Sequence, residues 1–105
     1  MKIEVLYFEG CPNHFPTLER IRQVLREEGF DAEVKEVLVP DVEPARNTRF
    51  LGSPSVRVND VDIEPAANAR FDFGLMCRRY PDGIPSSELI RMALRAASEI
   101  EDAGQ

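Results

Sequence analysis

Residues 3–14, IEVLYFEGCPNH, place a cysteine between an apolar run and a segment with helical periodicity. The run from Ile3 to Phe8 is rich in β-branched and aromatic residues, which is typical of a buried strand. Cys11 follows this strand and precedes the helix, whose first backbone N–H groups lack internal partners and carry partial positive charge. This position favours the thiolate, the form of cysteine that attacks disulfides and binds soft metals.

The next segments predict a β-α-β unit with parallel strands. Apolar residues recur at helical spacing over residues 13–28, and Gly29 is the expected helix end. A second strand is expected over residues 31–39, where the alternation that includes Val34 slips at Val37 and indicates a bulge or a register change. The helix between the two strands implies a right-handed crossover.

The second half of the chain predicts a short helix, a hairpin and a final helix. They are expected, in this order, over residues 41–50, over residues 55–64 with a turn at Asn59-Asp60, and from Ser86 or Ser87 to about Ile100. Residues 65–85 hold too many apolar side chains for a free loop. We expect this segment to pack back on the body, with a short extended piece over residues 76–80.

Composition and charge limit the class of protein. The 105 residues suffice for one core, so residues 1–105 are expected to form a single domain. A formal net charge of −6 argues against a nucleic acid or an anionic membrane as partner. The N-terminus has no secretory apolar region, and no run reaches the roughly 18 apolar residues of a membrane span. We therefore expect a cytoplasmic protein whose two cysteines are reactive or free, without a cofactor.

The order of these segments, with Ser53-Pro54 directly before the hairpin, resembles the thioredoxin-like fold. The resemblance covers nearly the whole chain, with residues 65–85 as extra material. It implies an α/β fold with a central mixed four-stranded sheet flanked by helices. It also implies a cis Pro54 that lies against the nucleophile Cys11, with Pro12, Ser53 and Pro54 contacting the substrate.

The motif around the first cysteine and the later Cys77-Arg78-Arg79-Tyr80 are similar to those of small bacterial thioredoxin-like proteins, some of which are labelled alkylmercury lyase. The chain departs from thioredoxin in one respect. The familiar Cys-x-x-Cys is here Cys11-Pro12-Asn13-His14, so a histidine stands where the resolving cysteine would be. The dithiol cycle therefore cannot take place within this motif.

Each candidate residue has a structural alternative. Cys11 is either an activated nucleophile or a small buried hydrophobe. His14, three residues further along a first helical turn, either meets Cys11 as a charge, base or metal ligand, or is a surface histidine. Cys77 is either a resolving thiol or second soft ligand, or a core cysteine. Arg78 and Arg79 either favour a thiolate at Cys77, bind an anion, or are solvated surface charges.

Three functions follow from these residues. The first, which we favour, is a thiol–disulfide oxidoreductase that acts on a protein or a low-molecular-weight disulfide, with Cys77 or an external thiol such as glutathione releasing the mixed disulfide. The second is binding of a soft metal ion, mercury or copper, by the two thiolates and His14, with Asp72 as acid in a mercury–carbon lyase. The third is a binding module that has kept the fold, lost turnover and recognises a protein partner.

Overall fold

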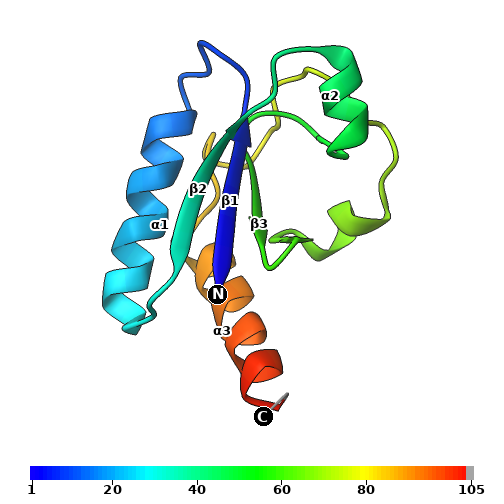
Figure 1. Ribbon diagram of the computed structural model, residues 1–105. Helices are drawn as coiled ribbons and strands as arrows, with labels where there is room; N and C mark the ends of the chain where they lie inside the picture. Colours follow the sequence, from blue (N-terminus) through cyan, green and yellow to red (C-terminus); the bar gives the residue numbers. More distant parts are fainter. Residues whose placement is uncertain (104–105) are drawn as a thin grey trace.

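The computed structural model describes residues 1–103 and contains a four-stranded mixed sheet flanked by helices (Figure 1). The elements are β1 (Lys2–Tyr7), α1 (His14–Glu28), β2 (Glu33–Leu38), α2 (Val42–Asn47), β3 (Ser55–Val58), β4 (Val61–Asp62), the 3₁₀ helix η1 (Pro65–Ala69) and α3 (Ser87–Ala103). The strand order is β2-β1-β3-β4, in which β1 and β2 are parallel and the other two pairs are antiparallel. The predicted α/β class with a mixed four-stranded sheet is confirmed.

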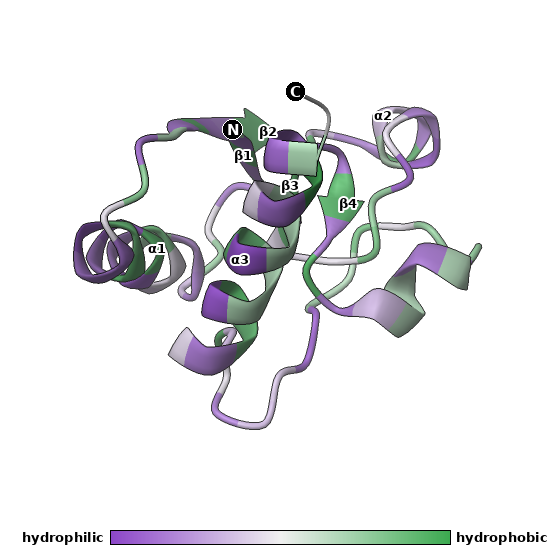
Figure 2. Ribbon diagram, turned by 90° about the horizontal axis from the view of Figure 1, so that it is seen from below, coloured by the Kyte–Doolittle hydropathy of each residue, from purple (hydrophilic) through white to green (hydrophobic). Residues whose placement is uncertain are grey.

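The sheet separates two apolar clusters. Figure 2 shows α1 and α3 against one face of the sheet and α2 against the other. The larger cluster joins the first face to both long helices, and its members include Val5, Ile21, Val56 and Leu94. The smaller cluster, on the α2 side, consists of Leu6, Val39, Ala45 and Phe50.

Strand β2 explains the slip in apolar phase that the sequence shows. Its pairing with β1 runs without interruption from Lys2 opposite Glu33 to Tyr7 opposite Leu38, so the predicted bulge is wrong. Val34 packs on the larger cluster and Val37 on the smaller one. Successive side chains of a strand point to opposite faces, and helices cover both faces here, so apolar residues are needed in both phases.

Helix α1 ends and the hairpin turns where the sequence predicts. Gly29 adopts a φ of 70° and closes α1, with its N–H donating to Arg26 O. Asn59 and Asp60 both have positive φ, 51° and 70°, which is the conformation of a two-residue turn between antiparallel strands. β3 and β4 are shorter than expected.

Two helices differ in length from the prediction. α2 begins after Asp41, whose Oδ1 accepts from Val42 N, but it ends at Asn47 because Phe50 turns into the smaller cluster. α3 follows Ser86, whose Oγ accepts from Leu89 N, and extends past Ile100. Among residues 1–103, no helix has the length and the apolar character needed to cross a membrane.

Candidate functional site

Cys11 lies in the turn between the end of β1 and the start of α1. Its N–H donates to Phe8 O at 3.3 Å, and its carbonyl accepts from His14 N at 3.4 Å. α1 begins at His14, so Pro12 lies in the turn, and is exposed, rather than in the first helical turn. The thiol is free and half-buried, and within residues 1–103 no N–H group donates to its sulfur.

The His14 side chain contacts two strands of the sheet. Its ring stacks on Tyr7 with the centroids 3.6 Å apart and the planes 7° apart. Its Nε2 is 2.9 Å from Glu36 Oε1, but this close contact is not a hydrogen bond. In the described part of the chain no hydrogen bond joins His14 to the Cys11 thiol, and a role of His14 beside Cys11 stays a prediction.

The contacts of His14 with Tyr7 and Glu36 can be predicted from the sequence only when the register of β1 and β2 is known. Val5 lies opposite Glu36 in the parallel pairing of β1 and β2, and Tyr7 is two residues further along the same face. A residue at the start of α1 therefore meets both side chains. His14 links the start of α1 to two strands of the sheet.

Ser53-Pro54 lies directly before β3, and the peptide bond between the two residues is cis, as the resemblance implies. Ser53 Oγ accepts from Phe8 N at 3.4 Å. Ser53 also donates its own N–H to Met76 O at 2.8 Å, and its carbonyl accepts from Arg78 N at 3.0 Å. Ser53 is therefore bonded on one side to the strand that leads to Cys11 and on the other to the segment that carries Cys77.

Cys77 forms a parallel bridge with Ser53 and is an exposed free thiol. The interpretation of Cys77 as a core cysteine is wrong, because its side chain points to solvent while its backbone pairs with the body. The expectation that residues 65–85 pack back on the body, with an extended piece over residues 76–80, is confirmed at this bridge and at the bond from Gly74 N to Phe50 O.

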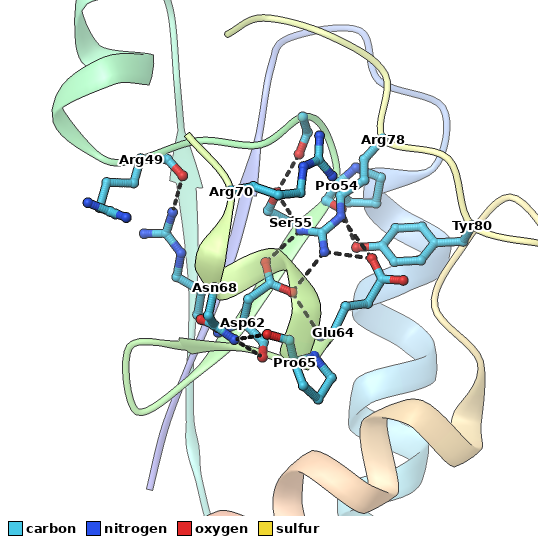
Figure 3. A network of polar contacts seen from close by, with 12 residues as sticks. Arg49, Pro54, Ser55, Asp62, Glu64, Pro65, Asn68, Arg70, Arg78 and Tyr80 are labelled. Atoms are coloured by element: carbon cyan, nitrogen blue, oxygen red, sulfur yellow. Dashed lines mark hydrogen bonds and ion pairs between the residues drawn. The ribbon is translucent and has the colours of Figure 1, made fainter. Parts of the chain in front are cut away.

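Arg78, next to Cys77, is buried with only 5% of its surface exposed, and no alternative considered from the sequence describes it. Its guanidinium donates to both oxygens of Asp62, at 2.6 and 2.8 Å, and twice to Glu64 Oε1, at 2.6 and 3.2 Å (Figure 3). A fifth bond goes to Ser55 Oγ at 3.1 Å. All five N–H donors of the guanidinium are thus used within the protein, and Arg78 is free neither to assist a thiolate nor to bind an anion.

Tyr80 completes this network. The Tyr80 hydroxyl donates to Pro54 O at 2.9 Å, and the Arg78 guanidinium lies 5.2 Å from the centre of the Tyr80 ring. The segment after Cys77 is therefore fixed to the cis peptide and to the β3–β4 hairpin. In the sequence, only the two acidic residues Asp62 and Glu64 indicate that a cation is buried at this place. The sequence around them does not indicate which arginine pairs with them.

Burial of the Tyr80 ring raises the pKa of its hydroxyl above the ordinary value of a tyrosine. The folded state holds this proton more tightly than the unfolded state. The contribution of Tyr80 to the free energy of unfolding is therefore complete below about pH 10 and decreases as the pH rises above it. We expect wild type to lose up to about 1.4 kcal/mol per pH unit more than Tyr80→Phe above that pH. Urea unfolding of both proteins on either side of pH 10 measures the difference, and parallel pH profiles would contradict the assignment to Tyr80.

The residues do not form a metal centre of three ligands. In residues 1–103 no three His, Cys, Asp or Glu side chains are grouped to hold an ion, so Cys11, Cys77 and His14 do not converge. Asp72 is bound through both oxygens to Arg70, at 2.9 and 2.6 Å. That guanidinium lowers the pKa of Asp72, which keeps it ionised and unsuited to donate a proton in a lyase reaction.

No family model, curated protein or solved structure matches this chain.

Proposed function

We propose that this chain is a thioredoxin-like thiol–disulfide oxidoreductase in which Cys11 is the attacking thiolate and Cys77 the resolving thiol. The observation that carries the proposal is the position of Ser53, which is hydrogen-bonded to Phe8 on the Cys11 side and to Met76 and Arg78 on the Cys77 side. The order of strands and helices and the cis Ser53-Pro54 support the thioredoxin-like assignment.

The reaction consists of two thiol–disulfide exchanges. The Cys11 thiolate attacks one sulfur of a substrate disulfide, a new sulfur–sulfur bond forms, and the other substrate sulfur leaves as a thiolate. The Cys77 thiolate then attacks Cys11 Sγ, so that the first substrate sulfur also leaves and a Cys11–Cys77 disulfide remains. The substrate gains two electrons and the protein loses two. An external thiol reduces the protein disulfide before the next cycle.

The surrounding residues have separate roles in this proposal. Pro12 is exposed beside Cys11 and offers a surface on which the substrate docks, whereas Ser53 and Pro54 are buried and hold the neighbouring segments in place. Cys11 lies just before the N-terminus of α1, so the positive end of the helix points toward its turn. His14 positions the start of α1 through Tyr7 and Glu36.

The resolving step makes a geometric demand that can be tested directly. A disulfide needs the two Cα atoms within about 7 Å, and Cys77 is the only other cysteine in the sequence. With oxidised glutathione, we expect Cys77→Ser to accumulate a mixed disulfide at Cys11 and wild type to form the internal Cys11–Cys77 disulfide instead. Peptide mass spectrometry after acid quenching identifies both species.

Cys11→Ser is the matched control, because it keeps the exposed Cys77 thiol. We expect oxidised glutathione to react with Cys77 in this variant at least about tenfold more slowly than with Cys11 in Cys77→Ser, since only Cys11 lies at the start of a helix. Equal rates at the two cysteines would remove the attacking role of Cys11. A mixed disulfide that persists in wild type would remove the resolving role of Cys77 and leave that step to an external thiol.

A further inference from the structure

A small polar pocket lies on the α2 side of the sheet and is lined by neither cysteine. It has a volume of about 90 Å³, with Arg57 of β3, Asn68 of η1 and the loop residues Arg49, Arg70 and Phe73 among its lining residues. α2 has only six residues and covers the end of the sheet around Leu6, so charged side chains occupy the rest of this face. Three guanidinium groups therefore meet at one pocket in a chain of net charge −6.

The carboxylates around the pocket are already paired with other cations. Asp60 binds Lys2 at 3.0 Å, and Asp62 binds Arg78 through both oxygens. Arg70 itself is bound by Asp72. Within residues 1–103, Arg49 and Arg57 form no ion pair with any carboxylate, although Asp60 and Asp62 also line the pocket.

Arg57 is held in place by the end of α2. Its Nη2 donates to Thr48 O at 2.6 Å and to Arg49 O at 2.9 Å, both carbonyls that follow the last turn of the helix. Its Nε and Nη1 donate to no group in the described part of the chain. Burial lowers the pKa of Arg57, while the nearby carboxylates of Asp62, Glu4 and Asp60 act in the opposite direction.

Arg49 is held in place by two aromatic rings. Its guanidinium carbon lies 5.4 Å from the centre of the Phe71 ring and 5.0 Å from that of Phe73. These contacts restrict the side chain but use none of its five N–H donors, and among residues 1–103 none of them has an acceptor. Arg49 and Arg57 thus both present unused N–H donors at one small pocket.

We propose that this pocket binds a phosphate group, either as inorganic phosphate or as the phosphate of a small phosphate monoester. Guanidinium groups match the geometry of phosphate oxygens, with paired N–H donors to paired acceptors. A phosphate monoester carries a charge of about −1.5 to −2 near neutral pH, which balances the charges of Arg49 and Arg57. A carboxylate would compensate only one of the two, so the charge balance favours phosphate.

The test is a titration of isotopically labelled protein with inorganic phosphate at constant ionic strength, followed by backbone amide NMR. We expect saturable shifts at residues 48–49, 57 and 68–73, and binding that is at least about tenfold weaker in Arg49→Gln, because one charged donor group is lost. Arg22→Gln is the matched control, since Arg22 is an exposed arginine on α1 outside the pocket and its loss changes the net charge by the same amount.

A second variant changes affinity in the opposite direction. Glu4 lies opposite Arg57 in the β1–β3 register without forming an ion pair, and Glu4→Gln is expected to tighten phosphate binding.

A parallel titration with glycerol phosphate identifies the source of the group: tighter binding than inorganic phosphate indicates a monoester, and equal or weaker binding indicates phosphate itself. Shifts that do not saturate, or equal affinities in wild type, Arg22→Gln and Arg49→Gln, would overturn the proposal. None of these outcomes depends on Cys11.

Discussion

Replacing Arg78 with methionine is expected to lower the free energy of unfolding by about 3–5 kcal/mol, because removal of one partner leaves a buried charge unpaired. Asp62 would retain a carboxylate whose side chain is only 6% exposed, whereas the Glu64 side chain, 37% exposed, can be hydrated. The penalty therefore arises mainly at Asp62. Urea unfolding monitored by circular dichroism measures the change.

The neighbouring residue provides the control. Arg79 is exposed, so Arg79→Met removes the same charge and is expected to change stability by no more than about 0.5 kcal/mol. If the unpaired carboxylate is the cause, Asp62→Asn should recover part of the loss in the Arg78→Met background, although it removes a further charge. A loss below about 1 kcal/mol in Arg78→Met, or no recovery in the double variant, would contradict this account of the network.

The Arg78 network also bears on how Cys77 is placed. Besides its five side-chain bonds, Arg78 donates its backbone N–H to Ser53 O. Two residues later, the Tyr80 hydroxyl donates to Pro54 O. The network thereby fixes residues 76–80 beside the cis peptide. Under the proposed function, loss of the network would slow formation of the Cys11–Cys77 disulfide without removing either thiol.

The elements that the sequence predicts well are those that depend on local patterns. Helical spacing locates α1, Gly29 marks its end, and Asn59-Asp60 marks the hairpin, since each depends on residues close together in the chain. The fold class follows from the order of these elements. α2 is shorter than expected because Phe50 is required in the smaller cluster, which is a demand of tertiary packing.

The candidate site was predictable only in part, for the same reason. The location of Cys11 between strand and helix and the position of Ser53-Pro54 are local features. The partners of His14 depend on the parallel register that brings Glu36 beside Tyr7, and those of Arg78 depend on a contact between segments 14 and 16 residues apart. An i, i+3 relation allows Cys11 and His14 to meet, but only the fold shows that the His14 ring stacks on Tyr7.

Gly52, directly before Ser53, is the position where a single added carbon should disturb the proposed site most. Its φ is 112°, which side chains of L-residues rarely adopt. A Cβ atom there would lie 3.0 Å from both Cγ and O of Met76 and 3.1 Å from Cβ of Arg78. Backbone strain and overpacking each contribute about 1–3 kcal/mol, so Gly52→Ala is expected to lower the free energy of unfolding by about 2–5 kcal/mol.

The contact with residues 76–78 can be separated from backbone strain by a second glycine. Gly83 has a φ of 86° and nothing within 4 Å of its hypothetical Cβ, so Gly83→Ala carries the strain alone. The amide of Ser53 donates to Met76 O, and that of Arg78 donates to Ser53 O. In Gly52→Ala we expect hydrogen exchange at these two amides to accelerate by more than the loss of global stability explains. Equal losses of stability in the two variants, with both amides still protected, would contradict this prediction. They would show that Met76 and Arg78 move to accommodate the added carbon, so that the Ser53–Cys77 bridge does not require a glycine at position 52.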